Sequence, residues 1–454
     1  DTTADGSLAK PYKTLHFFVN GRKAQGGDRI VLLPGNHGSL AANKWTTSYL
    51  VGTTKWIWLD FRPGAIMISL DLRDMSRWLI TNGEFTAPGV RFASFSDGTN
   101  IVVADNQMYT TRNTSGWGPT EWLAASSGIS TRNAKCVSIL RNKLTNIRAG
   151  MTFLSDATTV ADSRQKILVE GNEIRNFSAD GMRPIGSDIT MRNNKLYDQY
   201  LGSGDGDGNH DDGIQMFALG GFAQDNIVLD NNWIQETTNP NRAYIGGMQG
   251  IGHFDGPMTN FKVTNNTIIT SVWHGITTGA RDSLVANNTV VNYTNNGVNS
   301  WITVNDGKSE SIVPYNTVVR NNIAVTFRTI PVVITENNYS VSDPASVFRV
   351  FDKATATFDL RPKAGSIIDG KGAGSFPTGT APTTGPSGDN PPTCTLSAPT
   401  YVERDVSVTL ALASVNATSA TINQGVGAIA VNGTRVVTPI DTTTYTATVT
   451  GAGG

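Results

Sequence analysis

Residues 171–196 read GNEIRNFSADGMRPIGSDITMRNNKL and contain one complete unit of a sequence repeat. Asn172 and Asn194 bound the unit, and each precedes a short run with apolar residues. Asparagine suits a repeated turn because it tolerates the left-handed backbone conformation and bonds its own backbone. The same position recurs at Asn172, Asn194, Asn232, Asn266, Asn288 and Asn322. The successive spacings of 22, 38, 34, 22 and 34 residues indicate a basic unit of 22 that insertions lengthen.

A second column of the repeat is a triplet in which a small or polar residue precedes a glycine and an apolar residue. Its members are Ala149-Gly150-Met151, Asp180-Gly181-Met182, Asp212-Gly213-Ile214, Gln249-Gly250-Ile251, His274-Gly275-Ile276 and Asn296-Gly297-Val298. A repeat of this size, built from short strands and tight turns, is typical of a solenoid. We therefore expect stacked coils in which the asparagines form a hydrogen-bonded ladder.

The distance between the two columns varies from unit to unit. Asp180 follows its asparagine by 8 residues, whereas Asp212 follows by 18 and Gln249 by 17. Two neighbouring coils thus carry long loops at one corner. Such loops can drift freely in a solenoid, but adjacent insertions also build a wall beside a binding face. The sequence favours the second interpretation.

Composition excludes several classes of function. The chain has 454 residues with 36 basic and 37 acidic side chains, so its net charge indicates no polyanion-binding surface. It has neither a basic stripe nor zinc-ligand spacing, which argues against a nucleic-acid partner. No apolar run approaches the length of a membrane span. The two cysteines, Cys136 and Cys394, fall in different predicted domains and do not form a disulfide framework.

The beginning of the chain carries a family resemblance. DGSLAKPYKTLHFF (residues 5–18) and GGDRIVLLPGNHG (residues 26–38) resemble the N-terminal start of right-handed parallel β-helix proteins. The asparagine ladder and the glycine column are similar to those of the pectate-lyase-like superfamily, over roughly residues 5–370. That superfamily includes polysaccharide lyases, glycoside hydrolases, uronate epimerases and phage tailspike depolymerases. The resemblance is specific for the fold and leaves the reaction open.

The expected fold class is all-β: a right-handed parallel β-helix with a short N-terminal capping helix, plus a small C-terminal β-sandwich. Residues 1–371 would form the β-helix catalytic domain, with about a dozen coils at roughly 25 residues per coil. Residues 372–392, rich in Gly, Pro, Ser and Thr, have the composition of a linker. Residues 393–454 contain short alternating strands, and CTLSAPTYVERDVSVTL (residues 394–410) resembles bacterial immunoglobulin-like repeats.

Candidate catalytic residues gather in the coils with long loops. Asp180, Asp212 and His274 share one column position, and neighbours in a column stack at ~5 Å across one coil and ~10 Å across two. These separations bracket the carboxyl distances of retaining and inverting glycosidases. An Asp before Gly can simply satisfy a turn, which would explain Asp180 but explains the run from His210 to Asp212 less well. The predicted catalytic group is Asp180, Asp211, Asp212, His210, His253 and His274.

Within that group, Asp180 with either Asp211 or Asp212 is the expected acid–base pair, and His253 or His274 would orient a carboxyl or a sugar hydroxyl. Asp211-Asp212 and His274-Gly275 resemble the polygalacturonase-type hydrolases of the superfamily, although the full signature of that family is not present. Predicted substrate-binding residues are Arg183, Gln215, Tyr244, Asp255 and Trp273. Arg183 suits an acidic sugar, and the aromatic rings suit the face of a pyranose.

The loop from Asp205 to Asp211 suggests a metal site. Asp205, Asp207 and Asn209 match the first half of a calcium loop. The sixth position is His210 and the twelfth is Met216, so this is not an EF-hand, but other loops could complete a Ca²⁺ site. The alternative is a flexible acidic turn. Hydrolysis would require no cofactor, whereas bound Ca²⁺ would favour a lyase by neutralising a uronate carboxyl.

The favoured function is a depolymerase that hydrolyses internal bonds of a bacterial or algal, acidic polysaccharide. A Ca²⁺-assisted lyase or a uronate epimerase is the alternative, and a glycan-binding adhesin or tail fibre without catalysis is a third possibility. We expect a polysaccharide partner, no nucleic acid, no membrane span, and a homotrimer if the chain is tailspike-like. The expected location is extracellular, on a cell surface or on a virion.

Overall fold

The structure is a computed structural model that describes residues 4–201, 210–218, 224–305, 313–376, 393–399, 402, 405–415, 417, 419–441 and 443–450. The chain divides into two compact units, Asp1–Gly379 and Thr380–Gly454. The predicted metal-binding residues Asp205, Asp207 and Asn209 lie outside the described residues. Among those described, no helix combines the length and the apolar character needed to cross a membrane.

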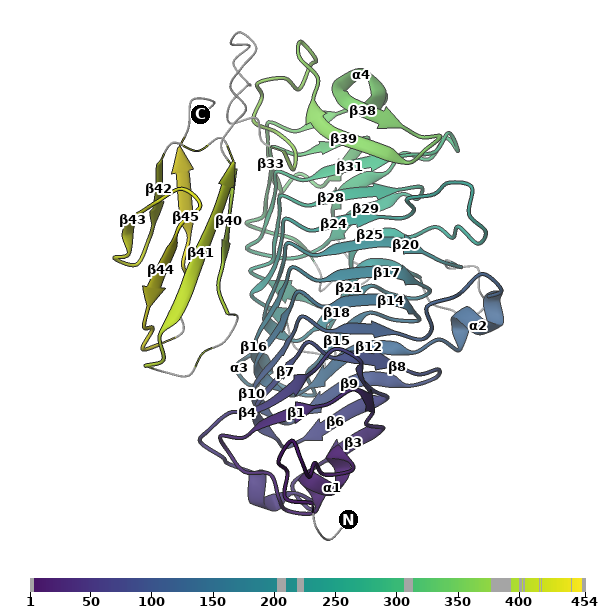
Figure 1. The fold of residues 1–454 in the computed structure, drawn as a ribbon. Coiled ribbons are helices and arrows are strands. Elements are labelled where there is room, and N and C mark those ends of the chain that lie inside the picture. Colours follow the sequence, from purple (N-terminus) through teal and green to yellow (C-terminus); the bar gives the residue numbers. More distant parts are fainter. Residues whose placement is uncertain are drawn as a thin grey trace. The chain divides into compact units, whose positions relative to one another are not determined.

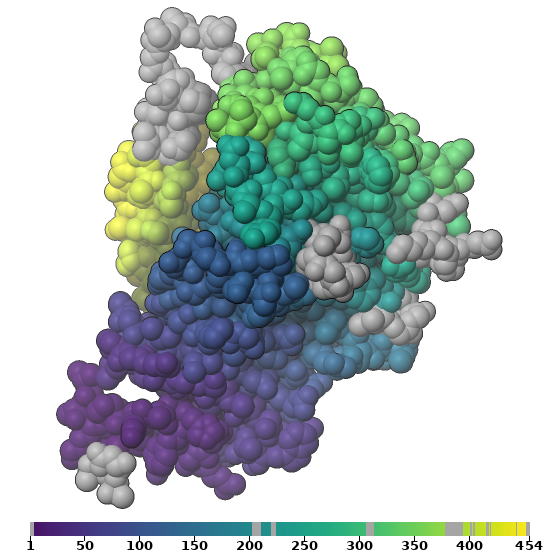
Figure 2. Space-filling view, turned by 90° about the vertical axis from the view of Figure 1, so that its right-hand side faces the viewer, coloured from purple at the N-terminus to yellow at the C-terminus, as the bar shows by residue number. Residues whose placement is uncertain are grey.

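The first unit is a coil of stacked turns, each of which adds one strand to each of three parallel sheets (Figure 1). The first sheet has 12 strands in the order β1-β4-β7-β10-β13-β16-β19-β23-β27-β30-β33-β36, the second has 12 and the third has 11. Sequence colours follow one another along this unit in the space-filling view, as stacked coils require (Figure 2). This architecture confirms the predicted parallel β-helix.

The strand bounds show how short each side of a coil is. The first sheet contains β1 (Arg29–Leu32), β4 (Ile57–Phe61), β7 (Ser76–Thr81), β10 (Thr99–Ala104), β13 (Lys135–Leu140), β16 (Arg164–Glu170), β19 (Ser187–Arg192), β23 (Ile227–Asp230), β27 (Lys262–Thr264), β30 (Leu284–Ala286), β33 (Val318–Arg320) and β36 (Ile334–Glu336). The second contains β2 (Gly35–Asn36), β5 (Ala65–Met67), β8 (Glu84–Thr86), β11 (Gln107–Tyr109), β14 (Lys143–Ile147), β17 (Glu173–Phe177), β20 (Lys195–Gln199), β24 (Trp233–Gln235), β28 (Thr267–Thr270), β31 (Thr289–Asn292), β34 (Ile323–Ala324) and β37 (Tyr339–Ser340). The third contains β3 (Ser39–Ala42), β6 (Ser69–Arg73), β9 (Arg91–Ser96), β12 (Ser127–Arg132), β15 (Met151–Leu154), β18 (Met182–Ile185), β21 (Asp212–Phe217), β25 (Gln249–Asp255), β29 (His274–Thr278), β32 (Trp301–Val304) and β35 (Thr326–Thr329).

The asparagine ladder runs inside the turn between the first and second sheets. Asn172 Nδ2 donates to Asn194 Oδ1 at 3.0 Å, and Asn194 Nδ2 donates in the same way to Asn232 Oδ1 at 3.0 Å. The ladder continues through Asn266, Asn288 and Asn322, and it extends beyond the predicted range to Asn106, Asn142 and Asn338. Because the ladder amides from Asn106 to Asn322 are buried, these rungs satisfy polar groups that water does not reach.

The left-handed backbone conformation belongs to the residue before each rung, not to the rung itself. Asn193 has a φ of 58° and Asn231 a φ of 51°, and Gly171 takes this place, with a φ of 68°, before Asn172. The expectation that the ladder asparagines themselves adopt this conformation was therefore wrong. A flanking residue makes the tight turn, which frees the rung side chain to bond along the coil axis.

The glycine column marks where neighbouring coils approach most closely. A Cβ added to Gly150 would lie 2.1 Å from Gly181 O, and one added to Gly250 would lie 2.2 Å from Gly275 O. The sixth predicted triplet was wrong: Gly297 lies in a loop with a φ of 75°, whereas Trp301 is the register partner of His274. Only glycine fits the true column because backbone atoms fill the space of a side chain.

We expect Gly250→Ala to destabilise the first unit by about 1–3 kcal/mol, because the added methyl group must push two backbones apart. Thermal unfolding followed by circular dichroism measures the effect. Gly116→Ala is the matched control, since a Cβ there meets nothing within 4 Å. Equal unfolding temperatures for the two variants would contradict the close approach of the coils.

Both ends of the first unit are covered. Helix α1 (Leu15–Asn20), the predicted N-terminal helix, begins at Thr14, whose Oγ1 accepts from Phe17 N at 3.1 Å, and it buries Leu15 and Val19. At the other end, helix α4 (Pro344–Val347) leads into an antiparallel hairpin of β38 (Phe348–Asp352) and β39 (Thr357–Pro362). Three further helices interrupt the coils, namely η1 (Ser48–Leu50), α2 (Pro119–Leu123) and α3 (Val160–Ser163), and a small sheet pairs β22 (Gln224–Asp225) with β26 (Met258–Thr259).

The segment that follows the hairpin returns to the second sheet. Ser375 Oγ accepts from Thr267 Oγ1 at 2.6 Å, and Ser375 N donates to Thr289 Oγ1 at 2.9 Å. Gly374 N donates to Asn321 O at 2.8 Å. Residues 374–376, at the start of the predicted linker, thus pack on the β-helix.

The second unit contains two three-stranded antiparallel sheets. One has the order β40 (Thr393–Ser397), β41 (Val408–Val415) and β44 (Thr434–Val437), and the other has the order β43 (Gly427–Ile429), β42 (Ser419–Ile422) and β45 (Ala447–Thr450). Leu410 and Leu412 from the first sheet share a small core with Ala420 and Ile422 from the second. This arrangement confirms the predicted β-sandwich.

Candidate active site

The third sheet presents one outward residue from each coil in a straight row. Parallel register aligns Thr152 with Arg183, Gln215 with Gly252, Gly252 with Thr277, and Thr303 with Arg328. We call the set the site row: Thr152, Arg183, Gln215, Gly252, Thr277, Thr303 and Arg328. The predicted column residues precede four members of the site row by three residues each. They are Asp180 before Arg183, Asp212 before Gln215, Gln249 before Gly252 and His274 before Thr277.

Asp180 and Asp212 lie together on adjacent coils. Asp180 Oδ1 accepts from the backbone N of Asp212 at 2.8 Å, and the two residues are 2% and 0% exposed. Each carboxyl also bonds its own site-row residue: Arg183 forms an ion pair with Asp180, and Gln215 Nε2 donates to Asp212 Oδ2 at 3.1 Å. Because the coils repeat at the strand spacing of ~4.8 Å, the backbones of the two residues lie about that far apart along the column.

Asp212 differs from an ordinary surface carboxyl. Burial raises its pKa well above 3.8, and the charges of Asp180 and Asp211 raise it further. Its Oδ1 has no hydrogen-bond partner in the described part of the chain, although water does not reach it. A Cβ at Gly252 would lie 2.9 Å from this oxygen, so the missing side chain leaves room for it. The raised pKa favours the protonated carboxyl, which is the form that can act as an acid.

This raised pKa predicts a pH-dependent stability. The unfolded chain ionises Asp212 near 3.8, whereas the folded chain retains the proton, so stability falls as pH rises above that value. Asp212→Asn removes this pH dependence. We expect the melting temperature of the variant minus that of the wild type to be larger at pH 8 than at pH 4. Asp255→Asn, at an exposed position, is the control. An identical difference at both pH values would show that Asp212 titrates normally.

The neighbouring Asp211 has another partner. Gln199 Nε2 donates to Asp211 Oδ2 at 2.7 Å, and Gln199 comes from β20 in the second sheet. The structure thus brings Asp212, rather than Asp211, against Asp180. The charge of Asp211 still contributes to the raised pKa of Asp212.

His274 stands on the aromatic side of the acid pair. Its ring lies edge-to-face with Phe254 at 5.1 Å and with Trp301 at 5.0 Å, and Nδ1 lies 2.9 Å from Thr277 Oγ1. Burial lowers its pKa, and the positive charges of His210 and Arg328 lower it further. A neutral imidazole near the acid pair can accept a proton or a hydroxyl hydrogen bond.

Trp273 and Trp301 extend this aromatic side. Their rings stack with centroids 6.1 Å apart, and the Arg328 guanidinium lies 3.9 Å from the Trp301 ring centroid. Trp273 is 55% exposed, so its free face is available to a sugar ring. Trp273 was among the substrate-binding residues predicted from the sequence, whereas Trp301, Arg328 and Phe254 were not.

The structure does not bring His253 to the site row. It is in register with Met216, whose side chain is fully buried, and is itself 2% exposed. Its Nε2 lies 2.9 Å from Gly256 O, so that nitrogen donates, and Nδ1 lies 3.2 Å from Thr278 Oγ1. Burial lowers its pKa to about 4, which keeps the ring neutral. Its contacts are those of a packed structural residue.

Three other predicted residues lie at the margins. His210 is exposed and near enough to His274 to influence its pKa. Tyr244 is 45% exposed, and its hydroxyl would lie 3.8 Å from a Cβ at Gly118, beside helix α2. Asp255 is exposed at the end of β25. The described ranges hold no group of three or more His, Cys, Asp or Glu residues placed to bind a metal ion.

Unpaired polar atoms gather on the same coils. Four buried side-chain atoms in β21, β25 and β32 of the third sheet have no hydrogen-bond partner among the described residues: Asp212 Oδ1, Gln249 Oε1, Trp301 Nε1 and Thr303 Oγ1. Buried polar groups without partners are rare in folded proteins and require an explanation. A polar ligand along the site row would supply partners for several of them.

A basic cavity adjoins the other side of the acid pair. It has a volume of about 340 Å³ and is lined by side chains from β9, β12, β15, β18 and the turns before them. Arg91, Arg148 and Arg183 contribute the charge, while Ser127 and Thr152 add hydroxyl groups. The row therefore runs from an arginine-rich end, past two carboxyl groups, to an aromatic end.

These features define the first unit as a parallel β-helix protein with an acid pair on one sheet. It is similar to the Dettilon tailspike protein, with a TM-score of 0.36 and 13% identity over 65% of this chain and 56% of that chain. It is also similar to a mannuronic acid specific polysaccharide family 6 lyase enzyme from human gut microbiota, with a TM-score of 0.33 and 11% identity over 72% of this chain and 86% of that chain. No family model matches the chain, and no curated protein matches it significantly. The match thus spans little more than half the length of the tailspike.

Proposed function

We propose that the first unit is a polysaccharide depolymerase that hydrolyses glycosidic bonds with Asp212 and Asp180. One observation carries the proposal: a buried carboxyl of raised pKa lies beside a second carboxyl that an arginine pairs. Glycosidases need one protonated carboxyl as acid and one ionised carboxyl as base or nucleophile. Asp212 suits the first role, and Asp180, paired with Arg183, suits the second.

The spacing of the coils favours retention of configuration. Adjacent coils place the carboxyl groups at ~4.8 Å, close to the ~5–5.5 Å of retaining enzymes. In that mechanism Asp180 attacks the anomeric carbon while Asp212 gives its proton to the leaving oxygen. Water then cleaves the glycosyl ester, and Asp212 takes back a proton. The edge of Phe254 lies over Gly252 beside Asp212 Oδ1, so an entering sugar ring would displace it.

The ends of the site row support an acidic polysaccharide as substrate. Arginine forks bind carboxylates and sulfates in a bidentate manner, and three of them line the cavity beside Asp180. Stacked Trp273 and Trp301 suit a sugar at the opposite end. Viscosity and new reducing ends, measured with a panel of acidic polysaccharides, test the proposal. Polysaccharides that bind to the protein but are never cleaved would instead support an adhesin or tail fibre.

A lyase is the second candidate because His274 is kept neutral between Phe254 and Trp301. Such a base could remove a proton beside a uronate carboxylate that Arg183 or Arg328 neutralises. In this case Ca²⁺ held by the predicted loop of Asp205, Asp207 and Asn209 would assist. Hydrolysis predicts that a chelator leaves activity unchanged and that products lack an ultraviolet-absorbing double bond. Loss of activity with chelator, restored by Ca²⁺, together with that chromophore would favour the lyase.

We further propose that the protein works outside the cell or on a virion, where polysaccharide is accessible. A homotrimer remains a prediction that depends on a tailspike-like role. Light scattering coupled to size-exclusion chromatography measures the mass in solution. A monomer that cuts polymer would show that the row is complete within one chain.

A further inference from the structure

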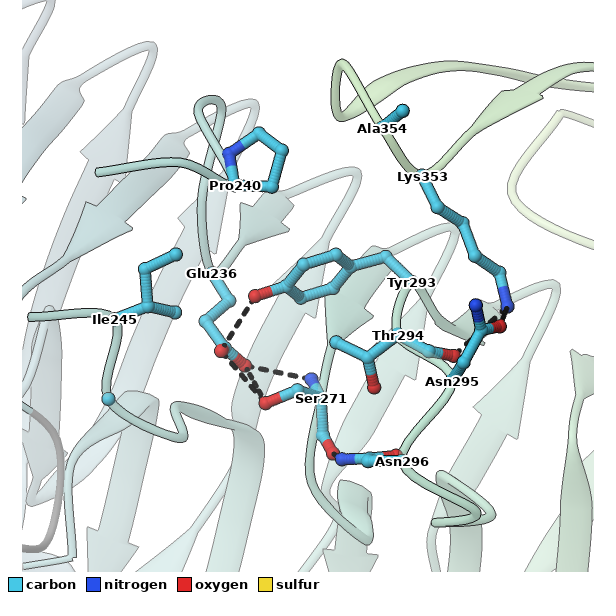
Figure 3. Close-up of a pocket in the computed structure, with 11 residues that line it drawn as sticks. Glu236, Pro240, Ile245, Ser271, Tyr293, Thr294, Asn295, Asn296, Lys353 and Ala354 are labelled. Carbon is cyan, nitrogen blue, oxygen red and sulfur yellow. Dashed lines mark hydrogen bonds between the residues drawn. The ribbon is translucent and has the colours of Figure 1, made fainter. Parts of the chain in front are cut away.

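A second cavity opens at the corner between the second and third sheets (Figure 3). Its volume is about 530 Å³, within the range of small-molecule sites. Its walls come from the loops that follow β24, β28 and β31 and from the turn of the β38–β39 hairpin. The residues that matter to its chemistry are Glu236, Ile245, Ser271, Tyr293, Asn295 and Lys353.

The floor of this cavity is a fully buried carboxyl. Glu236 accepts from Ser271 N at 2.8 Å, from Ser271 Oγ at 2.8 Å and from Tyr293 Oη at 2.9 Å. Thr270 Oγ1 lies 3.2 Å from the same carboxyl, and its hydroxyl also donates to Met248 O. These bonds orient the hydroxyl hydrogens of Ser271 and Tyr293 toward Glu236. The two hydroxyl oxygens are therefore left as acceptors for a ligand hydroxyl.

The rim supplies donors and one positive charge. Lys353 Nζ donates to Thr294 O at 3.0 Å and to Asn295 Oδ1 at 2.8 Å, which leaves its third hydrogen available. No acidic side chain in the described part of the chain forms an ion pair with Lys353. Asn295 is exposed and its Nδ2 makes no hydrogen bond there. Ile245 and Pro240 line the wall with apolar groups.

This cavity is separate from the acid pair. Its lining includes neither Asp180 nor Asp212, and the turn Ser271–Trp273 borders it through Ser271. Ser300 Oγ fixes this turn by donating to Val272 O at 2.6 Å. Val272 also packs against Gly247, where a Cβ would lie 2.6 Å from Val272 Cγ1. The Ser271 side of the turn faces the cavity, whereas Trp273 stacks on Trp301. A ligand in the cavity thus need not touch Asp180 or Asp212.

We propose that the Glu236 cavity is a second saccharide site, which binds one pyranose unit bearing a carboxylate. Ring hydroxyls donate to Ser271 and Tyr293, the apolar ring face meets Ile245 and Pro240, and the carboxylate meets Lys353 and Asn295. The proposal rests on the proposed function only for the class of ligand. Such a site binds the polysaccharide away from the glycosidic bond that is cleaved.

Saturation-transfer difference NMR on the full chain tests this site. The probes are the methyl glycosides of glucuronate and galacturonate, with methyl glucoside and methyl galactoside as uncharged counterparts and acetate as an anion without a ring. We expect a uronate glycoside to bind, and the double variant Lys353→Ala/Asn295→Ala to weaken that binding by about tenfold, since two hydrogen bonds and a charge are lost. Lys371→Ala, at an exposed position on the same unit, should bind as wild type does.

Other outcomes separate this site from the acid pair. The loss of binding caused by Lys353→Ala/Asn295→Ala should be the same in a Trp273→Ala background, because Trp273 belongs to the site row and does not line this cavity. The proposal is overturned if no glycoside binds, if acetate binds as well as the uronate glycosides, or if the double variant binds like wild type. Binding lost in the double variant, in a protein that cuts no polymer, would support this cavity while refuting the depolymerase.

Discussion

Asp212→Asn should lower polymer cleavage by about 10³-fold, because removal of a general acid typically costs 10²–10⁴-fold. The amide keeps the shape of the side chain and can still accept from Gln215, so the fold should persist. It has no acidic proton to give to the leaving oxygen. Reducing ends released from the cleaved polysaccharide measure the loss. Full activity in this variant would show that Asp212 is not the acid.

The nature of the leaving group separates the roles of the two carboxyl groups. An aryl glycoside with an acidic phenol leaves without protonation, so it should restore much of the first step in Asp212→Asn. Asp180→Asn should stay inactive on the same compound, because it lacks the nucleophile. Asp441→Asn, at an exposed position in the second unit, should retain activity on both substrates. Rescue of Asp180→Asn alone would reverse the two assignments.

Asn232→Ala should destabilise the first unit by about 4 kcal/mol, because it removes four buried hydrogen bonds worth about 1 kcal/mol each. Asn232 Nδ2 donates to Met191 O at 3.0 Å and to Asn266 Oδ1 at 3.0 Å. Its Oδ1 accepts from Asn194 N at 3.1 Å and from Asn194 Nδ2 at 3.0 Å. The loss leaves buried groups on both neighbouring coils without partners. Calorimetric unfolding measures the effect.

An asparagine outside the ladder provides the control for this experiment. Asn241 is exposed, and its side chain makes no hydrogen bond with the described residues. Asn241→Ala should change stability by less than about 0.5 kcal/mol. If both variants unfolded at the same temperature, the ladder would contribute nothing to stability and the stacked coils would depend on apolar packing alone.

The fold could be predicted from the sequence because its two columns report backbone geometry directly. Asn172 and Asn194 satisfy the same turn in successive coils, and Gly150 and Gly181 mark a close backbone approach. The last triplet failed because the coil of β32 has no glycine at this position and its register shifts between His274 and Ile276. The triplet at Gly297 matches the pattern in sequence but lies in a loop.

Part of the site could also be predicted, since column position placed Asp180, Asp212 and His274 on neighbouring coils. The position of His253 was predictable too: the apolar Ile251 points inward, so strand alternation turns Gly252 outward and His253 inward. Arg328 and Trp301 were not accessible in this way. Their coils lack the glycine marker, and Arg328 reaches the site only through the register of β32 and β35.

The protonation state of Asp212 tests the central claim most directly. The infrared difference spectrum between wild type and Asp212→Asn at pH 7 isolates this single carboxyl group. We predict the C=O stretching band of an un-ionised carboxyl in the wild-type protein, because burial and the charges of Asp180 and Asp211 keep the proton in place. A spectrum with only the bands of a carboxylate would contradict the account.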